Sequence, residues 1–241
     1  MGDTTNDSRF MTHGSTVPVL TIDGPSGSGK GTVGQVLAQR LGWRFLDSGA
    51  LYRALGVAAD RARVDLENKT ALARLAMVME IRFTPGTDGD SVDVMLNGEE
   101  VGNVLRTEES GRRASILGAI PDVRRALLQK QHSFRQLPGL VADGRDMGST
   151  VFPDALLKIY LTASPEVRAA RRYKQLKEKG FDVNLRRLLD EIRERDARDA
   201  ERETSPLKPA HDACILDTSQ LDISGVVEHV ESLLQERQRL R

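Results

Sequence analysis

The chain has 241 residues, of which 35 are Lys or Arg, 35 are Asp or Glu, and 39% are hydrophobic. This length fits one large domain or one domain with an insert, and the balanced charge argues against a nucleic-acid partner. No apolar run approaches the ~20 residues that cross a membrane, and the single cysteine, Cys214, excludes an internal disulfide and suits a reducing cytoplasm.

A glycine-rich segment follows the apolar run Val19–Ile22 and precedes a helical pattern; it reads Gly24-Pro25-Ser26-Gly27-Ser28-Gly29-Lys30-Gly31-Thr32. Glycines allow positive φ and turn backbone N–H groups toward an anion, and the helix adds its positive dipole end. Lys30 supplies a full charge for the outer phosphates. The segment therefore predicts a nucleoside triphosphate site, although Gly31 stands where the usual pattern has Ser or Thr.

Apolar strand patterns alternate with helical patterns along the rest of the chain. Strands are expected at 43–46, 140–142, 156–161 and 213–217, and helices at 48 onward, 67–79, 121–136, 164–180, 184–203 and from 223. Such alternation predicts a parallel sheet covered on both faces. Right-handed crossovers then place the loops that follow the strands along one carboxyl edge.

One stretch departs from this alternation. Residues 81–83 and 92–96 alternate apolar and polar side chains around a predicted hairpin turn at 86–90, and a short strand follows at 99–101. The fold class expected is therefore α/β: a three-layer P-loop domain over residues 17–241, with an antiparallel β insert at 81–107 and a helical lid. Residues 1–16 are polar and lack the apolar core of a signal peptide, so we expect a disordered tail on a cytoplasmic protein.

Two further motifs belong to the predicted carboxyl edge. Asp47-Ser48-Gly49 opens a helix that carries Tyr52 and Arg53, which makes either a plain N-cap or a second anion site. Asp143-Gly144-Arg145-Asp146 follows a strand, and its carboxylates can hold Mg²⁺ through water or pair with a lysine. Its arginine can grip a phosphate; the alternative is a turn with an internal ion pair.

Arginines are dense between Arg168 and Arg202. The spacing of Arg195, Asp199 and Arg202 puts all three on one helical face. One interpretation is a solvated face with surface ion pairs, each worth about 0.2–0.5 kcal/mol. The other is a mobile lid at 171–205 that closes over the phosphates and excludes water, as a phosphotransferase must.

Segments 22–32, 46–53 and 142–148 resemble bacterial cytidylate kinase, as do segments 179–181 and 194–199. The likeness runs from about Val17 to the C-terminus, and the Gly-Thr ending of the glycine-rich loop is usual in nucleoside monophosphate kinases. The resemblance implies transfer of the ATP γ-phosphoryl group to CMP or dCMP, with Mg²⁺ brought by ATP and no metal ligand from the protein. It also implies a role in pyrimidine nucleotide metabolism.

The resemblance places ATP on Gly24 to Thr32. It implies an acceptor site for CMP made of Ser48, Tyr52, Arg53, Ser115, Arg124, Arg145, Asp146, Arg195, Asp199 and Arg202. Within this set the family's base-reading positions fall on Ser115, Arg124 and Asp146. The cytosine N4 amino group could donate to the serine and the aspartate, and its N3 and O2 could accept from the arginine.

The catalytic residues that the resemblance implies are Lys30, Arg145, Arg195 and Arg202. Ala200 and Glu201 depart from the basic or amide side chains expected after Asp199. Three alternatives remain open: a kinase for UMP, AMP or shikimate, a non-catalytic nucleotide-binding regulator, and an RNA-binding protein, which the lack of basic excess and stacking aromatics disfavours. We expect a monomer with ATP and CMP or dCMP as partners, and neither nucleic acid nor membrane.

Overall fold

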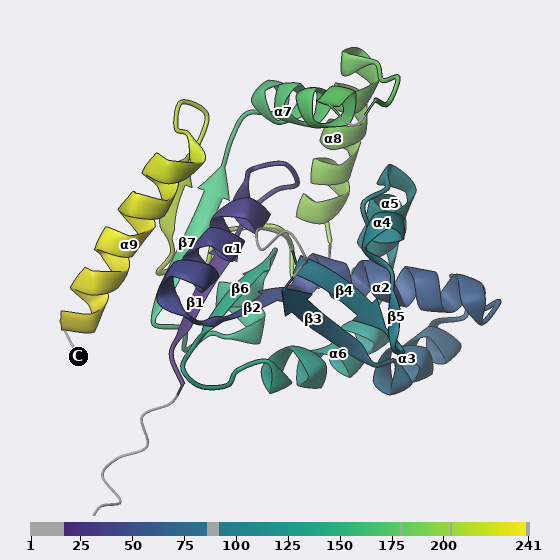
Figure 1. The fold of residues 1–241 in the computed structure, drawn as a ribbon. Coiled ribbons are helices and arrows are strands. Elements are labelled where there is room, and N and C mark those ends of the chain that lie inside the picture. Colours follow the sequence, from purple (N-terminus) through teal and green to yellow (C-terminus); the bar gives the residue numbers. More distant parts are fainter. Residues whose placement is uncertain (1–16, 86–91, 179, 203, 240–241) are drawn as a thin grey trace, which may run out of the picture.

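The computed structural model describes residues 17–85, 92–178, 180–202 and 204–239. A parallel sheet forms its centre. The five strands are β1 (Val19–Asp23), β2 (Arg44–Asp47), β6 (Leu140–Gly144), β7 (Leu157–Thr162) and β8 (Cys214–Asp217). Their order is β2-β6-β1-β7-β8, and every neighbouring pair is parallel, as the alternating pattern predicts (Figure 1).

Helices cover both faces of this sheet and complete the three predicted layers. On one face lie α1 (Lys30–Leu41) and α9 (Ile223–Arg239), and on the other lie α2 (Ser48–Arg61), α3 (Lys69–Val78) and α6 (Pro121–Ser133) (Figure 1). Successive strand residues point to opposite faces, so Val19 is buried with α2, α3 and α6, whereas Leu20 is buried with α1 and α9.

The insert is a separate antiparallel sheet. Its strands are β3 (Ile81–Pro85), β4 (Val92–Leu96) and β5 (Glu99–Glu100), in that order. Val94 and Leu96 are buried in the cluster that also contains α2 and α3, so the insert packs on the main domain, as its small size predicts. The hairpin turn predicted at 86–90 lies outside the described residues.

Two helices between β5 and α6 were not predicted. They are α4 (Gly102–Leu105), inside the expected bounds of the insert, and α5 (Glu108–Leu117). The buried face of α5 is made mainly of small side chains, Ser110, Gly111, Ala114 and Ser115, so it carries little hydrophobic periodicity. Gly111 and Ser115 of this face meet Arg195 and Asp199 of α8, so contacts with charged side chains, and not an apolar pattern, define where this helix lies.

Two long helices lie beyond the end of β7, and a π-helical turn follows β6. The helices are α7 (Pro165–Glu178) and α8 (Leu185–Ala200), and the turn is η1 (Met147–Val151) (Figure 1). Asn184 caps α8 as predicted, since its Oδ1 accepts from the Arg187 N–H at 3.1 Å. The helix ends at Ala200 and not at 203, so Arg202 lies past its last turn. Within the described residues no helix is long and apolar enough to cross a bilayer.

Candidate active site

The glycine-rich segment forms a strand–loop–helix unit, as predicted. β1 leads into the loop at Gly24, and α1 begins at Lys30 after a left-handed Gly29, whose φ is 92°. A Cβ on Gly24 would lie 2.0 Å from the Leu161 carbonyl oxygen. The loop therefore passes so close to the end of β7 that only glycine fits there.

Lys30 is folded back against its own loop. Its Nζ donates to the Pro25 carbonyl at 3.0 Å, and the residue is 8% exposed. Burial lowers the pKa of Lys30 to about 7; the nearby Arg145 lowers it further and Asp143 opposes the shift. A Cβ on Gly31 would lie 3.3 Å from the Asp143 Oδ2, so this carboxylate stands at the first turn of α1. A bound polyphosphate would supply the counter-charge that the lysine lacks.

The second motif lies at the same sheet edge. Asp47 ends β2 opposite Asp143 of β6, which in turn neighbours β1. Its Oδ1 accepts from the Ala50 N–H at 2.9 Å, which confirms the predicted N-cap of α2. Its Oδ2 accepts from Arg53 at 2.7 Å, so the arginine is held over the start of the helix beside the buried Ser48.

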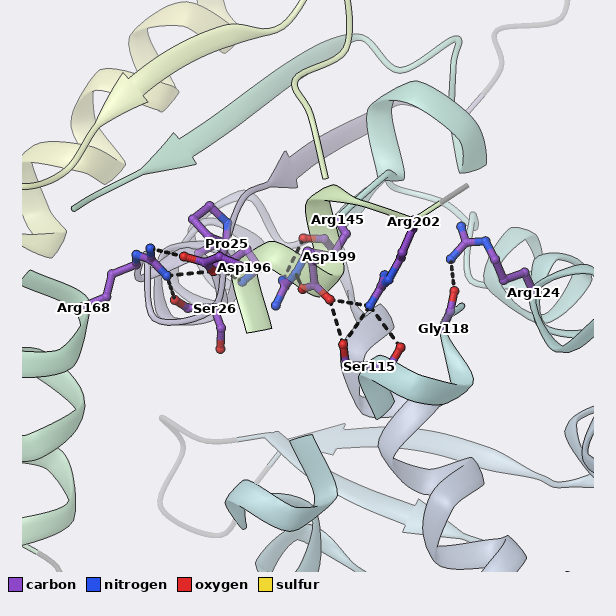
Figure 2. A network of polar contacts seen from close by, with 12 residues as sticks. Pro25, Ser26, Ser115, Gly118, Arg124, Arg145, Arg168, Asp196, Asp199 and Arg202 are labelled. Carbon is purple, nitrogen blue, oxygen red and sulfur yellow. Dashed lines mark hydrogen bonds and ion pairs between the residues drawn. The ribbon is translucent and has the colours of Figure 1, made fainter. Parts of the chain in front are cut away.

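Asp199 is the centre of a charged network drawn from three elements (Figure 2). Its Oδ1 accepts from Ser115 Oγ of α5 at 2.9 Å and from Arg202, and its Oδ2 accepts from Arg145 Nε at 3.0 Å. The aspartate is 1% exposed. Burial favours its neutral form, but Arg145, Arg202 and Arg195 outweigh burial and hold the pKa of Asp199 below its usual range.

Positive charge exceeds negative charge around this network. Arg195 of α8 is half-buried, and its Nη1 lies 2.9 Å from the position that a Cβ on Gly111 would take. Its Nε has no hydrogen-bond partner among the described residues. Burial, followed by repulsion from Arg145, lowers the pKa of Arg195 to about 10. Three arginines thus face one carboxylate, and the surplus charge suits an anion.

The three residues predicted to read the base are divided between two groups. Arg124 of α6 donates to Asp146, to the Gly118 carbonyl at 3.2 Å and to the Tyr52 hydroxyl at 3.4 Å. Burial raises the pKa of Tyr52 to about 12, so the phenol stays neutral. Ser115 instead contacts Asp199 and belongs to the neighbouring network (Figure 2).

Two buried contacts at the phosphate loop were missed by sequence reasoning. Arg168 of α7 donates to the Ser26 carbonyl at 3.0 Å, although the sequence placed it only among the lid arginines. Asp23, the last residue of β1, accepts from the N–H groups of Met147 and Gly148, both at 2.8 Å. A carboxylate at the end of an apolar strand is a sequence signal that could have identified this second contact.

Asp23 gives the free energy of unfolding a testable pH dependence. Burial raises the pKa of its carboxyl to about 7 against the lowering effect of the two N–H donors. The folded protein therefore binds more protons than the unfolded chain, whose Asp pKa is about 3.9. Unfolding free energy should thus fall as pH rises from about 4 to about 7, by up to about 1.4 kcal/mol per pH unit from this group.

Urea unfolding of the wild type and of Asp23→Asn across this range tests the expectation. The variant cannot titrate at this position, so the difference in unfolding free energy between the two proteins should change with pH. Only the change of this difference with pH is diagnostic. At every pH the amide also offers one acceptor oxygen fewer to the two N–H groups, which lowers the stability of the variant by itself. A difference that stays constant across the range would contradict the expectation.

Taken together, the fold and these groups define a P-loop phosphotransferase: a lysine-bearing phosphate loop and a partly buried arginine cluster share one sheet edge. Among the described residues no group of three or more His, Cys, Asp or Glu side chains could hold a metal ion. The family model for cytidylate kinase matches residues 20–236. The chain belongs to the cytidylate kinase family.

Relatives named cytidylate kinase support this assignment. A cytidylate kinase of Pseudomonas paraeruginosa (strain DSM 24068 / PA7) is 58% identical over 214 residues, which cover 89% of this chain and 93% of that protein. A cytidylate kinase of Shewanella sp. (strain W3-18-1) is 56% identical over 211 residues, with 88% and 92% covered. A solved gluconokinase from Sinorhizobium meliloti 1021 is more distant: it is 18% identical, with a TM-score of 0.45 over 93% of this chain and 96% of that one.

Proposed function

We propose that the protein transfers the γ-phosphoryl group of ATP to CMP and dCMP, giving ADP and CDP or dCDP. The observation that carries this proposal is the placement of Lys30 and the Asp199 network on one sheet edge. The loop would hold the donor, and the surplus arginine charge would hold the phosphate of the acceptor. The relatives named cytidylate kinase supply the identity of the acceptor.

The reaction requires little covalent work from the protein. An oxygen of the CMP phosphate forms a bond to the γ-phosphorus, and the bond from that phosphorus to the bridging oxygen of ADP breaks. The acceptor phosphate is already ionised near neutral pH, so no general base is needed. Charge on the transferring group would be stabilised by four side chains, those of Lys30, Arg145, Arg195 and Arg202.

The loop also has oxygen donors that suit Mg²⁺, which would enter with ATP. Asp143 Oδ2 lies beside Gly31 at the first turn of α1, and Thr32 follows directly. Carboxylate and hydroxyl oxygens, partly through water, are ligands that Mg²⁺ prefers. The bound ion would neutralise phosphate charge, while Asp143 would hold its water shell and Lys30 would hold the phosphates.

The cytosine base would lie near Arg124 and Asp146, with Ser115 in the neighbouring Asp199 network, and the phosphate of CMP would lie near Ser48, Tyr52 and Arg53. Asp146 uses Oδ2 to bind Arg124, and Oδ1 could then accept from the cytosine N4 amino group. Uracil carries an acceptor oxygen in place of that amino group. A UMP base would therefore leave a buried carboxylate facing another acceptor, which costs about 1–3 kcal/mol.

An acceptor screen tests both the reaction and the base assignment. With ATP as donor, kcat/KM for CMP and dCMP should exceed that for UMP and AMP by about 10- to 100-fold. Coupled measurement of ADP release with each monophosphate gives these values. Equal use of UMP would contradict the base assignment but leave the kinase intact. A protein that binds ATP and forms no ADP with any monophosphate would instead be a regulator.

The α7–α8 region, residues 171–205, is proposed as a lid over the phosphates. It is supported by Asp199 and Arg195, which α8 places beside Arg145 at the end of β6. The protein is proposed to act as a monomer in the cytoplasm, a compartment to which its single cysteine, Cys214, is suited. The predicted tail at residues 1–16 and Lys179, in the segment that joins the two lid helices, lie outside the described residues.

A further inference from the structure

Arg168 is a buried arginine that the proposed reaction does not use. It lies in the first turns of α7 and is 3% exposed. All three guanidinium nitrogens are engaged: Nε donates to the Ala163 carbonyl at 2.9 Å, Nη1 to the Ser26 carbonyl at 3.0 Å, and Nη1 and Nη2 both reach Asp196 of α8. One side chain thus joins the end of β7, the phosphate loop and α8 (Figure 2).

The bond to Ser26 affects the part of the loop that would meet the phosphates. A phosphate loop binds anions because its N–H groups converge, and a carbonyl turned inward would repel the ligand. The hydrogen bond from Arg168 keeps the Ser26 carbonyl oxygen directed toward α7. The Arg168 Cβ also lies 3.2 Å from the position that a Cβ on Gly27 would take, so the arginine stem packs against the left-handed turn of the loop.

Asp196 makes this support depend on α8. Nη1 of the arginine is shared between Ser26 and Asp196, and the aspartate side chain is 25% exposed while the arginine is buried. Movement of α8 away from α7 would remove the only carboxylate that the structure places on Arg168 among the described residues. The arginine would then be a buried charge bonded to carbonyls alone, which is unfavourable.

We propose that Arg168 is a positioning residue that fixes the phosphate-binding conformation of the loop, and that Asp196 couples this conformation to the position of α8. ATP binding and the docking of α8 would then favour one another, because each requires the same guanidinium orientation. The inference rests on the donor role proposed for the loop. It assigns to Arg168 and Asp196 an effect on ATP that neither residue exerts by direct contact.

Asp196→Asn is the principal test, because it keeps the shape of the side chain and removes its charge. Arg168→Lys is the second variant: it keeps the charge but cannot reach Ser26, Ala163 and Asp196 together. The matched control is Arg193→Gln, which breaks the exposed ion pair between Arg193 of α8 and Glu166 of α7, 2.7 Å long, without touching the loop. KM for ATP, KM for CMP, kcat and calorimetric ATP affinity are measured for each protein.

We expect each of the two test variants to raise KM for ATP and weaken ATP binding by about 10-fold or more, with KM for CMP within about 2-fold of wild type. The double variant should lose little beyond the single ones, because both act through one contact. Arg193→Gln should match the wild type. Urea unfolding shows whether each variant is folded under assay conditions. If one test variant is unfolded, the other serves as the test.

The inference would be overturned by variants that match Arg193→Gln, by variants that raise both KM values equally, or by additive losses in the double variant. A lowered unfolding free energy with unchanged ATP affinity would also overturn it, since the contact would then be structural alone. Failure of the wild type itself to bind ATP would count against the proposed function of the loop. These outcomes keep the two proposals distinguishable.

Discussion

Replacing Lys30 with methionine is expected to lower kcat by about 10²–10³-fold, which is the cost of losing one group that stabilises transition-state charge. Methionine fills a similar volume, so the loop should keep its packing. The Nζ bond to the Pro25 carbonyl is lost, but the charge removed is a buried one. The variant should therefore remain folded, with no fall in Tm. Steady-state kinetics and thermal unfolding of the two proteins give both quantities.

The same variant has an expected pH signature. Burial lowers the pKa of Lys30 to about 7 in the folded protein, whereas an unfolded lysine has a pKa of about 10.4. Well below pH 7 the folded wild type holds the buried charge in full, and this penalty is relieved as pH rises through 7 toward about 10. The unfolding free energy of Lys30→Met should thus exceed that of the wild type most below about pH 7. This difference should decline as pH rises above about 7.

Two results would contradict the role of Lys30. A variant with near-normal kcat would show that the lysine does not stabilise the transferring charge. A variant with a much lower Tm would show that the lysine supports the fold, and its loss of activity would then carry no mechanistic meaning. Circular dichroism at the assay temperature separates these cases.

Replacing Asp199 with alanine is expected to lower the unfolding free energy by about 3–5 kcal/mol, because it leaves paired charges buried without their partner. Arg145 and Arg202 would both lose the carboxylate that they share. Activity should fall with stability, since the proposed acceptor-phosphate site depends on the orientation of both arginines. Urea unfolding and kcat/KM for CMP are the measurements.

The matched control for this variant is Glu191→Gln, also on α8. Glu191 pairs with Arg187 one turn away at 2.9 Å, on a largely exposed surface. Exposed pairs of this kind contribute about 0.3–0.5 kcal/mol, so the control should keep nearly full stability and activity. Equal effects of the two variants would show that the Asp199 network is no more than another surface ion pair.

The sequence was sufficient to predict how three distant motifs meet. Gly24, Asp47 and Asp143 each follow or end an apolar strand, and parallel strands bring their carboxyl ends to one edge. Local chemistry was enough for the caps at Asp47 and Asn184, since each side chain binds a backbone N–H three residues further on. These predictions depend on short-range rules or on the topology alone.

The sequence was not sufficient to predict side-chain contacts that depend on how the helices pack. α5 carries Ser115 but presents a small-residue face, which gives no helical hydrophobic pattern. The contact of Arg168 with Ser26 joins residues 142 apart through a backbone carbonyl, and a carbonyl has no sequence signature. The pairing of Arg124 with Asp146 likewise depends on where α6 docks, which no spacing rule supplies.

The strand order of the main sheet has a consequence for the order in which the chain can fold. In the described sheet β1 bonds to β6 and β7, and β2 bonds to β6, so both early strands pair with segments beyond residue 139. The loop is anchored later still, through Arg168 and through Thr218, whose hydroxyl donates to the Ser28 carbonyl at 3.1 Å.

Closing contacts of such long sequence separation is slow. On a ribosome the phosphate loop emerges well before Arg168 and Thr218, which support it. A nascent chain that ends before β6 holds the whole glycine-rich motif and none of the geometry that would let it grip a nucleotide. The phosphate loop is the segment whose function is plainest in the sequence, yet its geometry is completed only after Thr218 has been added to the chain.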